Sequence, residues 1–563
     1  MGMGREQAVR RALVYGLIGG IVAWHLSLVG LIEAFAGRRL IGQGVTFSYV
    51  LLLAVMLTVG YLVARRVSNW TGLAGAALAG LLVGLALWAL ALLVDQVDLR
   101  TIFVAASPTL PEILTFNRGA GAVGLIVLLL VGAAAGFIGG GLTWFPATGR
   151  RAVITALSIT VLVGLLRDVL NPVLPALVMG FLFTTTGGLS LPGAVVVLAL
   201  ALAFPIARHV VAQRAGERRA ALPAPARRRR RAVFRLISLV FLVSFPLWAG
   251  LFLSNVTDFV GLYILMGLGL NLVLGFAGLL DLGYVAFFAI GAYSMAVLTS
   301  PELGHFTLGF WEALPIAVAI TVLSGILIGL PVLRMRGDYL AIATLGFGEI
   351  VRLLVLSDWL KPHLGGAQGV TRIARPELGP FVIDRPQEYY YLILIGCALA
   401  WFLSVRLRDS RIGRAWMAIR EDEDVAQAMG INRVTAKLLA FATGASMGGL
   451  SGALFASLVN SVIPQSFSLL VSINVVALLV LGGIGSLPGV LVGALALVGL
   501  PELLREFQEY RLLVYGAVLI AMMIFRPAGL WPEETRVREL EEAAEEARAR
   551  APAEVVVVTQ DGE

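Results

Sequence analysis

The stretch Arg414-Ala-Trp-Met-Ala-Ile-Arg-Glu-Asp-Glu-Asp-Val-Ala-Gln-Ala-Met-Gly-Ile-Asn432 is rich in charge and lies between two strongly apolar segments. These segments, 389–405 and 438–460, are suited to crossing a bilayer, which takes about 17–25 helical residues. A membrane protein must hold a charged loop of this kind in water. The alternation therefore predicts a helical membrane protein with a polar loop that faces a soluble partner.

The composition of the whole chain extends this pattern. Of its 563 residues 59% are hydrophobic and 14% are charged, and the mean hydropathy is +0.90. Soluble globular domains carry roughly 25% charged residues. Glycines at four-residue spacing, such as Gly132, Gly136 and Gly140, favour close packing of transmembrane helices. We therefore expect an all-α, polytopic membrane protein.

Counting apolar runs of about 17–25 residues predicts about 16 transmembrane helices. About six lie in the first part of the chain, at 12–36, 47–64, 71–94, 121–145, 152–170 and 178–206. About ten lie in the second part, at 233–253, 260–277, 281–300, 312–333, 338–357, 389–405, 438–460, 469–485, 489–504 and 510–525. The predicted organisation is an N-terminal membrane region, a basic linker, a second membrane region and a charged tail, at 1–210, 211–232, 233–532 and 533–563.

Arginines set the predicted topology. The unbroken run Arg227 to Arg231 cannot enter lipid and places the linker in the cytoplasm. Alternation from the linker puts Arg334, Arg336 and the loop 406–437 inside, and the segment 358–388 outside. Both termini are then cytoplasmic. The net charge of +8 is spread between apolar runs, so we interpret it as a topology signal and expect no nucleic-acid partner.

Several kinds of chemistry are not supported by the residues present. The single cysteine, Cys397, lies in an apolar run, and the four histidines are scattered, so we expect no metal site. The two lysines, Lys361 and Lys437, are not part of a Gly-Lys-Ser/Thr phosphate-binding loop. We expect no catalytic residues and no cofactor on this chain.

The charged loop holds the first group of candidate functional residues. Asp424, Val425 and Ala426 are followed after three residues by Gly430, a spacing typical of a short helix that ends at a glycine. Such a helix can dock into a groove of another protein, with Met429 and Ile431 as apolar anchors and the acidic cluster Glu421 to Asp424 setting the electrostatics. The alternative is a solvated charge run that stiffens the loop.

Asp281 is the first intramembrane candidate. Gly278 and Gly283 flank it and permit an interrupted helix, whose free backbone groups could hold the ammonium and carboxylate of an amino acid. The alternative, which the predicted topology favours, is a well-solvated helix cap at the cytoplasmic interface. Tyr284, in the same break, is a further candidate.

Two candidates lie in the run 338–357. Thr344 could line a substrate pathway, and Glu349 lies at intramembrane depth. Glu349 precedes Arg352 by three residues, so an intrahelical ion pair is an ordinary alternative explanation.

Five motifs resemble, in order, the M-type permease of branched-chain amino acid importers of the ATP-binding-cassette class. They are 270–293 (Leu-Asn-Leu-Val-Leu-Gly-Phe-Ala-Gly-Leu-Leu-Asp-Leu-Gly-Tyr to Tyr293), 336–352, 413–423, Leu481-Gly-Gly-Ile-Gly-Ser-Leu-Pro-Gly489 and Phe525-Arg-Pro-Ala-Gly-Leu-Trp-Pro532. The charged loop is similar to the family's Glu-Ala-Ala, three residues, Gly motif, with Asp424 for Glu and Val425 for the first Ala. The resemblance covers about 233–532, and 1–210 matches no part of it.

The resemblance implies a permease subunit without its own ATPase site, in the plasma membrane of a bacterium or archaeon. It implies two ATPase subunits that bind ATP and Mg²⁺, a second homologous permease and an extracytoplasmic binding protein. It also implies that the loop residues named above couple this chain to an ATPase subunit. Relatives of similar pattern import urea, short amides or other amino acids, so the substrate stays open. An ion-coupled secondary transporter that uses Asp281 or Glu349, and a membrane enzyme acting on lipids, are the alternatives from other classes.

Overall fold

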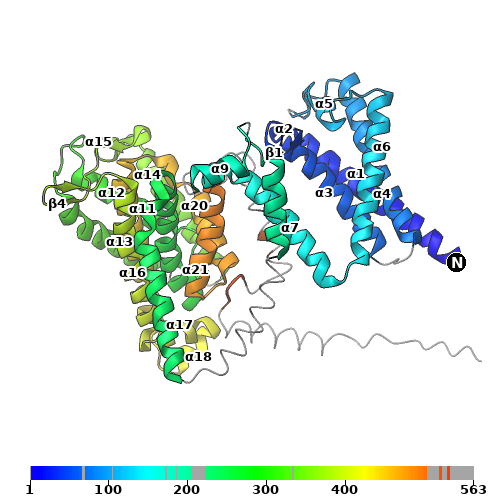
Figure 1. The fold of residues 1–563 in the computed structure, drawn as a ribbon. Helices are drawn as coiled ribbons and strands as arrows, with labels where there is room; N and C mark the ends of the chain where they lie inside the picture. Colours follow the sequence, from blue (N-terminus) through cyan, green and yellow to red (C-terminus); the bar gives the residue numbers. More distant parts are fainter. Residues whose placement is uncertain are drawn as a thin grey trace, which may run out of the picture. The chain divides into compact units, whose positions relative to one another are not determined.

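The computed structural model describes residues 2–203 and 224–503, with gaps at 43, 66–69, 104, 172–173, 186, 333–334 and 336, and the short pieces 516, 519–520, 522 and 529–532. Most of the predicted linker, Arg334, Arg336, most of the run 510–525 and the tail 533–563 lie outside the described residues. The chain divides into two compact units, 1–236 and 237–563 (Figure 1).

Four long apolar helices form the bundle of the N-terminal unit: α1 (Gly2–Leu28), α3 (Phe47–Ala64), α4 (Trp70–Gln96) and α6 (Ala122–Gly141). Glycines bring α4 and α6 into backbone contact. A Cβ atom on Gly80 would lie 2.0 Å from the carbonyl oxygen of Gly132, and one on Gly132 would lie 2.4 Å from that of Gly80. The close packing that the glycine spacing predicts is therefore confirmed for this pair.

Shorter elements complete the N-terminal unit: α2 (Leu31–Ala34), β1 (Arg39–Ile41), β2 (Val45–Thr46), α5 (Leu110–Leu114), a 3₁₀ turn (Leu142–Trp144), α7 (Ala147–Leu165), α8 (Arg167–Leu170), α9 (Ala176–Leu182) and a helix at 191–203. Strands β1 and β2 pair antiparallel. The prediction of one span at 178–206 is wrong. The chain leaves the helix at Phe183, which forms an antiparallel bridge with Leu189 before the next helix begins.

Helix α19 (Arg433–Val459) is the centre of the second unit, and 67% of its apolar 18-residue stretch is buried. It packs mainly against α12 (Val285–Thr299) and α13 (Phe310–Val332). Glycines again allow the contact, because a Cβ on Gly452 would lie 2.0 Å from the carbonyl oxygen of Phe288. The remaining long elements are α11 (Ala224–Leu270), α14 (Asp338–Leu356), α16 (Pro386–Arg408), α20 (Leu469–Gly482) and α21 (Leu487–Ala494).

Two wide, π-helical turns occur in this unit, at Asn271–Phe276, where they continue α11, and at Leu495–Gly499, between α21 and α22 (Leu500–Leu503). Helix α11 also contains a bend at Gly250 (φ 75°, ψ −179°). This bend separates two helical segments of α11, and it lies inside the predicted span 233–253. The loop expected at 254–259, between the predicted spans 233–253 and 260–277, is helical instead.

Among the described residues, nine helices are long and apolar enough to cross a membrane, or ten if α20 and the following helix, bent by 119°, form one span. The predicted number of about 16 is not confirmed. Helix α11 counts once, α12 has only 15 residues, and α7 with α8 replaces the expected continuous run at 152–170. The chain is nonetheless a multi-pass, all-α membrane protein in its main architecture.

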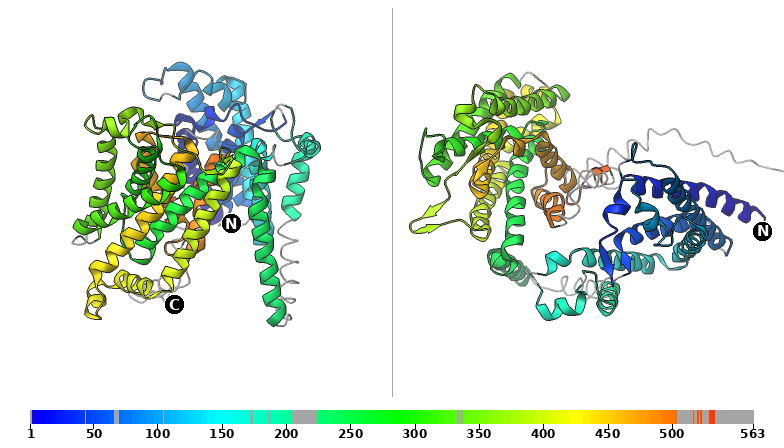
Figure 2. Two further views of the ribbon diagram at one scale, coloured as in Figure 1. Left: turned by 90° about the vertical axis from the view of Figure 1, so that its left-hand side faces the viewer. Right: turned by 90° about the horizontal axis from the view of Figure 1, so that it is seen from above.

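The two ends of the second unit differ in structure. One end carries α17 (Arg411–Glu421) and α18 (Glu423–Ala428) (Figure 1). The opposite end carries α15 (Lys361–Leu364), two 3₁₀ turns (Gly366–Gln368, Pro464–Phe467) and the strands β3 (Val370–Thr371), β4 (Glu377–Leu378), β5 (Phe381–Val382) and β6 (Ser461–Val462). Strand β3 pairs with β6, and the β4–β5 hairpin projects from the unit (Figure 2).

A carboxylate holds the loops of this opposite end together. Glu302 accepts hydrogen bonds from the backbone N–H (2.9 Å) and the hydroxyl of Thr371. These bonds favour the charged carboxylate and hold the pKa of Glu302 below its usual range. The segment 358–388 is therefore tied to the end of α12.

Candidate functional site

The charged loop folds into two short, capped helices. The hydroxyl of Ser410 accepts from the backbone N–H groups of Ile412 and Gly413, each at 3.2 Å, and begins α17. The carboxylate of Asp422 accepts from the N–H groups of Asp424 and Val425, each at 2.9 Å, and begins α18. Each cap satisfies backbone donors that a helix leaves without partners. The predicted short helix is therefore present.

Gly430 ends α18 in the left-handed conformation, with φ +88°. The N–H of Ile431 donates to the carbonyl of Ala426 at 3.1 Å, and the N–H of Gly430 donates to that of Gln427 at 3.0 Å. This is the hydrogen-bond pattern of a glycine-terminated helix. The glycine therefore has the helix-ending role that its position in the motif predicts.

Four exposed side chains form the outer face of this loop, which we call the coupling surface: Glu421, Asp424, Val425 and Met429. Met429 is 79% exposed and Val425 is 58% exposed. Ile431, the other predicted apolar anchor, is only partly exposed, and its side chain also packs against the hydrophobic core. Ala426 is buried. Helical periodicity turns Val425 and Met429 to one side and Ala426 to the other.

The coupling surface is fixed to the beginning of α19. The ammonium of the buried Lys437 lies 2.8 Å from a carboxylate oxygen of Glu423. Trp416, on α17, is fully buried and donates from its indole N–H to the carbonyl of Ala436 at 2.8 Å. A buried ion pair and a buried indole leave the two short helices little freedom relative to α19.

The predicted interruption near Asp281 is present in the second unit. The wide turn that follows α11 ends at Phe276, and α12 begins at Val285. We call residues 277–284 the intramembrane break. A Cβ atom on Gly283 would lie 1.7 Å from the carbonyl oxygen of Thr344, so the break is in direct backbone contact with α14.

Helix α12 begins at the middle of the unit. The hydroxyl of the fully buried Tyr284 donates to the carbonyl of Gly444 at 2.7 Å. Gly444 is 11 residues after Arg433, the first residue of α19, which corresponds to roughly 16 Å along the helix. Tyr284 therefore contacts α19 at the level at which the helix is interrupted.

Asp281 is buried, at 1% exposure. One of its carboxylate oxygens accepts from the N–H of Gly283 at 2.9 Å, and among the described residues the other, Oδ2, has no hydrogen-bond partner. The hydroxyl of Thr344 accepts from the neighbouring N–H of Leu282 at 3.1 Å. The alternative of a well-solvated cap is therefore wrong in this conformation, although Asp281 does close a turn.

The expectation of free backbone donors at the start of α12 is not met. The N–H of Val285 donates to the hydroxyl of Ser472 at 2.9 Å, and those of Ala286 and Phe287 donate to carbonyls within the turn. The unpartnered oxygen of Asp281 is thus a polar group at the break that is available for a ligand.

Glu349 lies apart from Asp281, beside a cavity of about 130 Å³. It forms an ion pair with Arg352 on the same helix, as its spacing predicts. The break contributes two apolar side chains to this cavity, whose lining is Leu282, Val285, Leu345, Gly348, Glu349, Phe467 and Leu469. The structure therefore brings Asp281, Tyr284 and Thr344 together and places Glu349 at the adjoining cavity.

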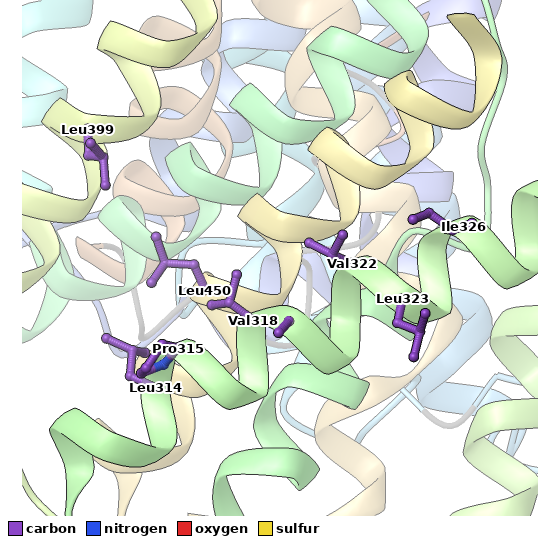
Figure 3. Close-up of a pocket in the computed structure, with 9 residues that line it drawn as sticks. Leu314, Pro315, Val318, Val322, Leu323, Ile326, Leu399 and Leu450 are labelled. Carbon is purple, nitrogen blue, oxygen red and sulfur yellow. The ribbon is translucent and has the colours of Figure 1, made fainter. Parts of the chain in front are cut away.

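A larger groove, of about 630 Å³, has no polar side chain in its lining (Figure 3). It runs along α13 from Leu314 to Ile326 and is completed by Leu399 and Leu450. A zwitterionic amino acid needs polar partners for both charged groups, so this groove is not a candidate for binding one. The described residues also contain no cluster of three or more potential metal ligands.

Asp258 is a buried carboxylate that sequence reasoning missed. It is fully buried in α11, and neither of its carboxylate oxygens has a hydrogen-bond partner among the described residues. It lies between the predicted spans 233–253 and 260–277, so the prediction places it in a loop. The signal in the sequence is the polar series Ser254, Asn255, Thr257 and Asp258 inside apolar surroundings.

Comparison with known proteins identifies the second unit. Residues 252–523 match the family described as branched-chain amino acid transport system / permease component. The chain is 40% identical over 323 residues to the high-affinity branched-chain amino acid transport system permease protein LivM of Salmonella typhimurium, covering 53% of this chain and 75% of that protein, and LivM of Escherichia coli gives the same values. LivH of Escherichia coli is 27% identical over 289 residues, covering 48% of this chain and 90% of that protein.

No solved structure matches the chain. The identity to LivM extends over three quarters of that permease, and the residues matched by the family include the break, α14 and the coupling surface. The chain therefore belongs to the family of branched-chain amino acid transport system permease components.

Proposed function

We propose that this chain is the transmembrane permease subunit of an ATP-binding-cassette importer for the branched-chain amino acids leucine, isoleucine and valine. The observation that carries the proposal is the pairing of an exposed helical surface at one end of the second unit with an interrupted helix in its interior. Transport that is coupled to ATP hydrolysis needs both a surface that binds an ATPase subunit and a pathway for the substrate.

The residues at the two places have different proposed roles. The coupling surface offers two apolar anchors, Val425 and Met429, and two acidic groups, Glu421 and Asp424, to an ATPase subunit. Asp281 offers its unpartnered oxygen to the ammonium group of the substrate. Thr344 and Glu349 line the route beside it.

The remaining parts of the transporter are supplied by other chains in this proposal. Two ATPase subunits bind and hydrolyse ATP, a second homologous permease completes the pathway, and an extracytoplasmic binding protein delivers the substrate. The relatives LivM and LivH, both named as permease proteins of branched-chain amino acid transport, support a pair of permeases. Residues 233–532 form the permease domain, the linker 211–232 and both termini are cytoplasmic, and 1–210 is an additional membrane region.

The direct test is purification of the tagged chain from native membranes in mild detergent, followed by reconstitution of whatever remains bound. We expect two ATPase subunits and a second permease, and ATP-dependent uptake of labelled leucine when the binding protein is added. Uptake by the chain alone under a proton or sodium gradient would contradict the proposal. Preference for urea or a short amide over leucine would keep the importer and change its substrate.

Replacing Gly430 with valine tests the coupling role. A β-branched side chain is strained at φ +88°, so the end of α18 must rearrange and displace Met429. We expect uptake to fall by about tenfold or more, with normal insertion in the membrane. Gly379→Val is the matched control, because Gly379 (φ +64°) also has open space around its Cβ position but lies in the β4–β5 hairpin. Equal uptake by both variants would remove the coupling role from this loop.

A further inference from the structure

Arg420 connects the coupling helices to the intramembrane break. It lies on α17, one residue before the coupling surface begins, and its guanidinium donates to the carbonyl of Gly275 at 2.9 Å. The two residues are 145 positions apart in the sequence. Its side chain is only 18% exposed and also contacts the carboxylate of Glu421 at 3.2 Å. One side chain therefore touches both the outer loop and the end of the interrupted helix.

The carbonyl of Gly275, which accepts this hydrogen bond, is free to do so because the helix is interrupted after it. Gly275 lies in the last turn before the break, where a helix has carbonyl groups without intrahelical partners. Cations are favourable at this end of a helix, and a guanidinium donor gives a charge-assisted hydrogen bond. Arg420 thus fixes the helix end from which residues 277–284 depart.

Gly278 shows how closely the two segments fit. It has φ +69°, and a Cβ atom there would lie 2.6 Å from Cγ and 3.1 Å from Cα of Arg420. The backbone of the break is therefore packed against the backbone and the side chain of the coupling helix. A displacement of α17 must either carry the break with it or separate this contact.

We propose that Arg420 is a positioning residue that transmits movement of the coupling surface to the intramembrane break. The inference rests on the proposed function for its role in transport, whereas the mechanical link itself does not. Arg420 neither contacts substrate in this scheme nor forms part of the ATPase docking face. It sets the position of the helix end beside Asp281.

The transport experiment compares Arg420→Ala, Arg420→Lys and the control Arg414→Ala in the reconstituted complex. Arg414 is on the same helix, and its guanidinium bonds to the carbonyl of Asp409 instead. For Arg420→Ala we expect unchanged retention of the ATPase subunits and an uptake per ATP hydrolysed about tenfold lower. A lysine can still donate to the carbonyl of Gly275, so the uptake per ATP hydrolysed by Arg420→Lys should lie between that of Arg420→Ala and that of the unaltered chain. An unchanged ratio in Arg420→Ala would overturn the proposal.

A second readout needs no transport. Leu279, in the break, is buried, and Cys397 is the single native cysteine. In a Cys397→Ser background, Leu279→Cys should react with a membrane-permeant maleimide about tenfold faster when Arg420→Ala is added, because the break is released. The Arg414→Ala control should leave this rate unchanged. An unchanged rate in Arg420→Ala would refute the link.

Uptake per ATP and the labelling rate together distinguish a failure of the proposed function from a failure of the proposed Arg420 link. Absence of ATP-dependent uptake by the unaltered complex, with faster labelling in Arg420→Ala, would refute the proposed function and retain the link. Normal uptake per ATP and slow labelling in Arg420→Ala would refute the link and retain the function. Gly278→Ala provides an independent variant with Arg420 intact, and we expect it to lower the uptake ratio and raise the labelling rate as well.

Discussion

The two units of this chain pack apolar helices in different ways. In the N-terminal unit, uninterrupted helices approach through glycines until their backbones touch, as at Gly80 and Gly132. In the second unit, glycines serve the same purpose along α19, but wide turns and breaks also interrupt the helices. The three charged residues that are fully buried in the described parts of the chain, Asp258, Asp281 and Lys437, all lie in the second unit. Buried charged groups are costly, so their presence indicates where function is located.

The largest expected effect comes from Gly283, at the break. A valine there would overlap the carbonyl of Thr344, which the Cβ position approaches to 1.7 Å, so the break cannot keep its contact with α14. We expect complete loss of leucine uptake. The matched variant in the other unit is Gly80→Val, whose Cβ position lies 2.0 Å from the carbonyl of Gly132. Gly80→Val should lower the free energy of unfolding by about 1–3 kcal/mol, and uptake per inserted chain should be unchanged. Equal loss of uptake per chain would show that the two units do not divide their roles in this way.

Asp281→Asn tests whether the charge of Asp281, and not only its turn-forming hydrogen bond, is needed for uptake. The amide oxygen can still accept from the N–H of Gly283, so the turn is kept while the charge is removed. We expect uptake to fall about 10- to 100-fold, the range for losing a charged hydrogen bond to the substrate. Asp338→Asn, at the exposed start of α14, is the control. Unchanged uptake in Asp281→Asn would reduce Asp281 to a turn-forming residue.

The smallest effect is expected from deleting residues 1–210. Apolar side chains and glycines make up the core of the N-terminal bundle, and its polar contacts, such as the bond from the indole N–H of Trp24 to the carbonyl of Ala86, lie within the same unit. We expect 211–563 to insert, to retain its partners and to take up leucine at the same rate per chain. The measurement is uptake normalised to chain in the membrane. A large loss would assign the first unit a direct part in transport.

Local patterns predict the local features of the candidate site. The helix that ends at Gly430 and the interruption flanked by Gly278 and Gly283 both depend on backbone conformations that nearby residues determine. The side on which a helix is buried depends on what it packs against, which is why the pattern does not predict that Ile431 is partly buried against the hydrophobic core. The prediction of a solvated Asp281 fails for the same reason.

Long-range contacts could not be predicted. Nothing in the sequence near Arg420 specifies a bond to a carbonyl 145 residues away. The position of Asp258 was missed because hydropathy places the boundary between the two spans at 254–259, whereas the helix is bent at Gly250 and residue 258 is helical. The predicted number of spans is not confirmed, because polar or bent segments divide some apolar runs, as at Phe183, and hydropathy records composition and not hydrogen bonding.

The wide turn at Asn271–Phe276 has a consequence for register. Its bonds skip one residue more than those of an α-helix, so it stores a single extra residue immediately before the break. If the same residues wound as an α-helix instead, everything beyond them would rotate by about 100° around the helix axis and move by about 1.5 Å along it. A change between π-helical and α-helical winding at this turn would therefore rotate the break, which contains Asp281, without moving it by a full helical turn along the axis.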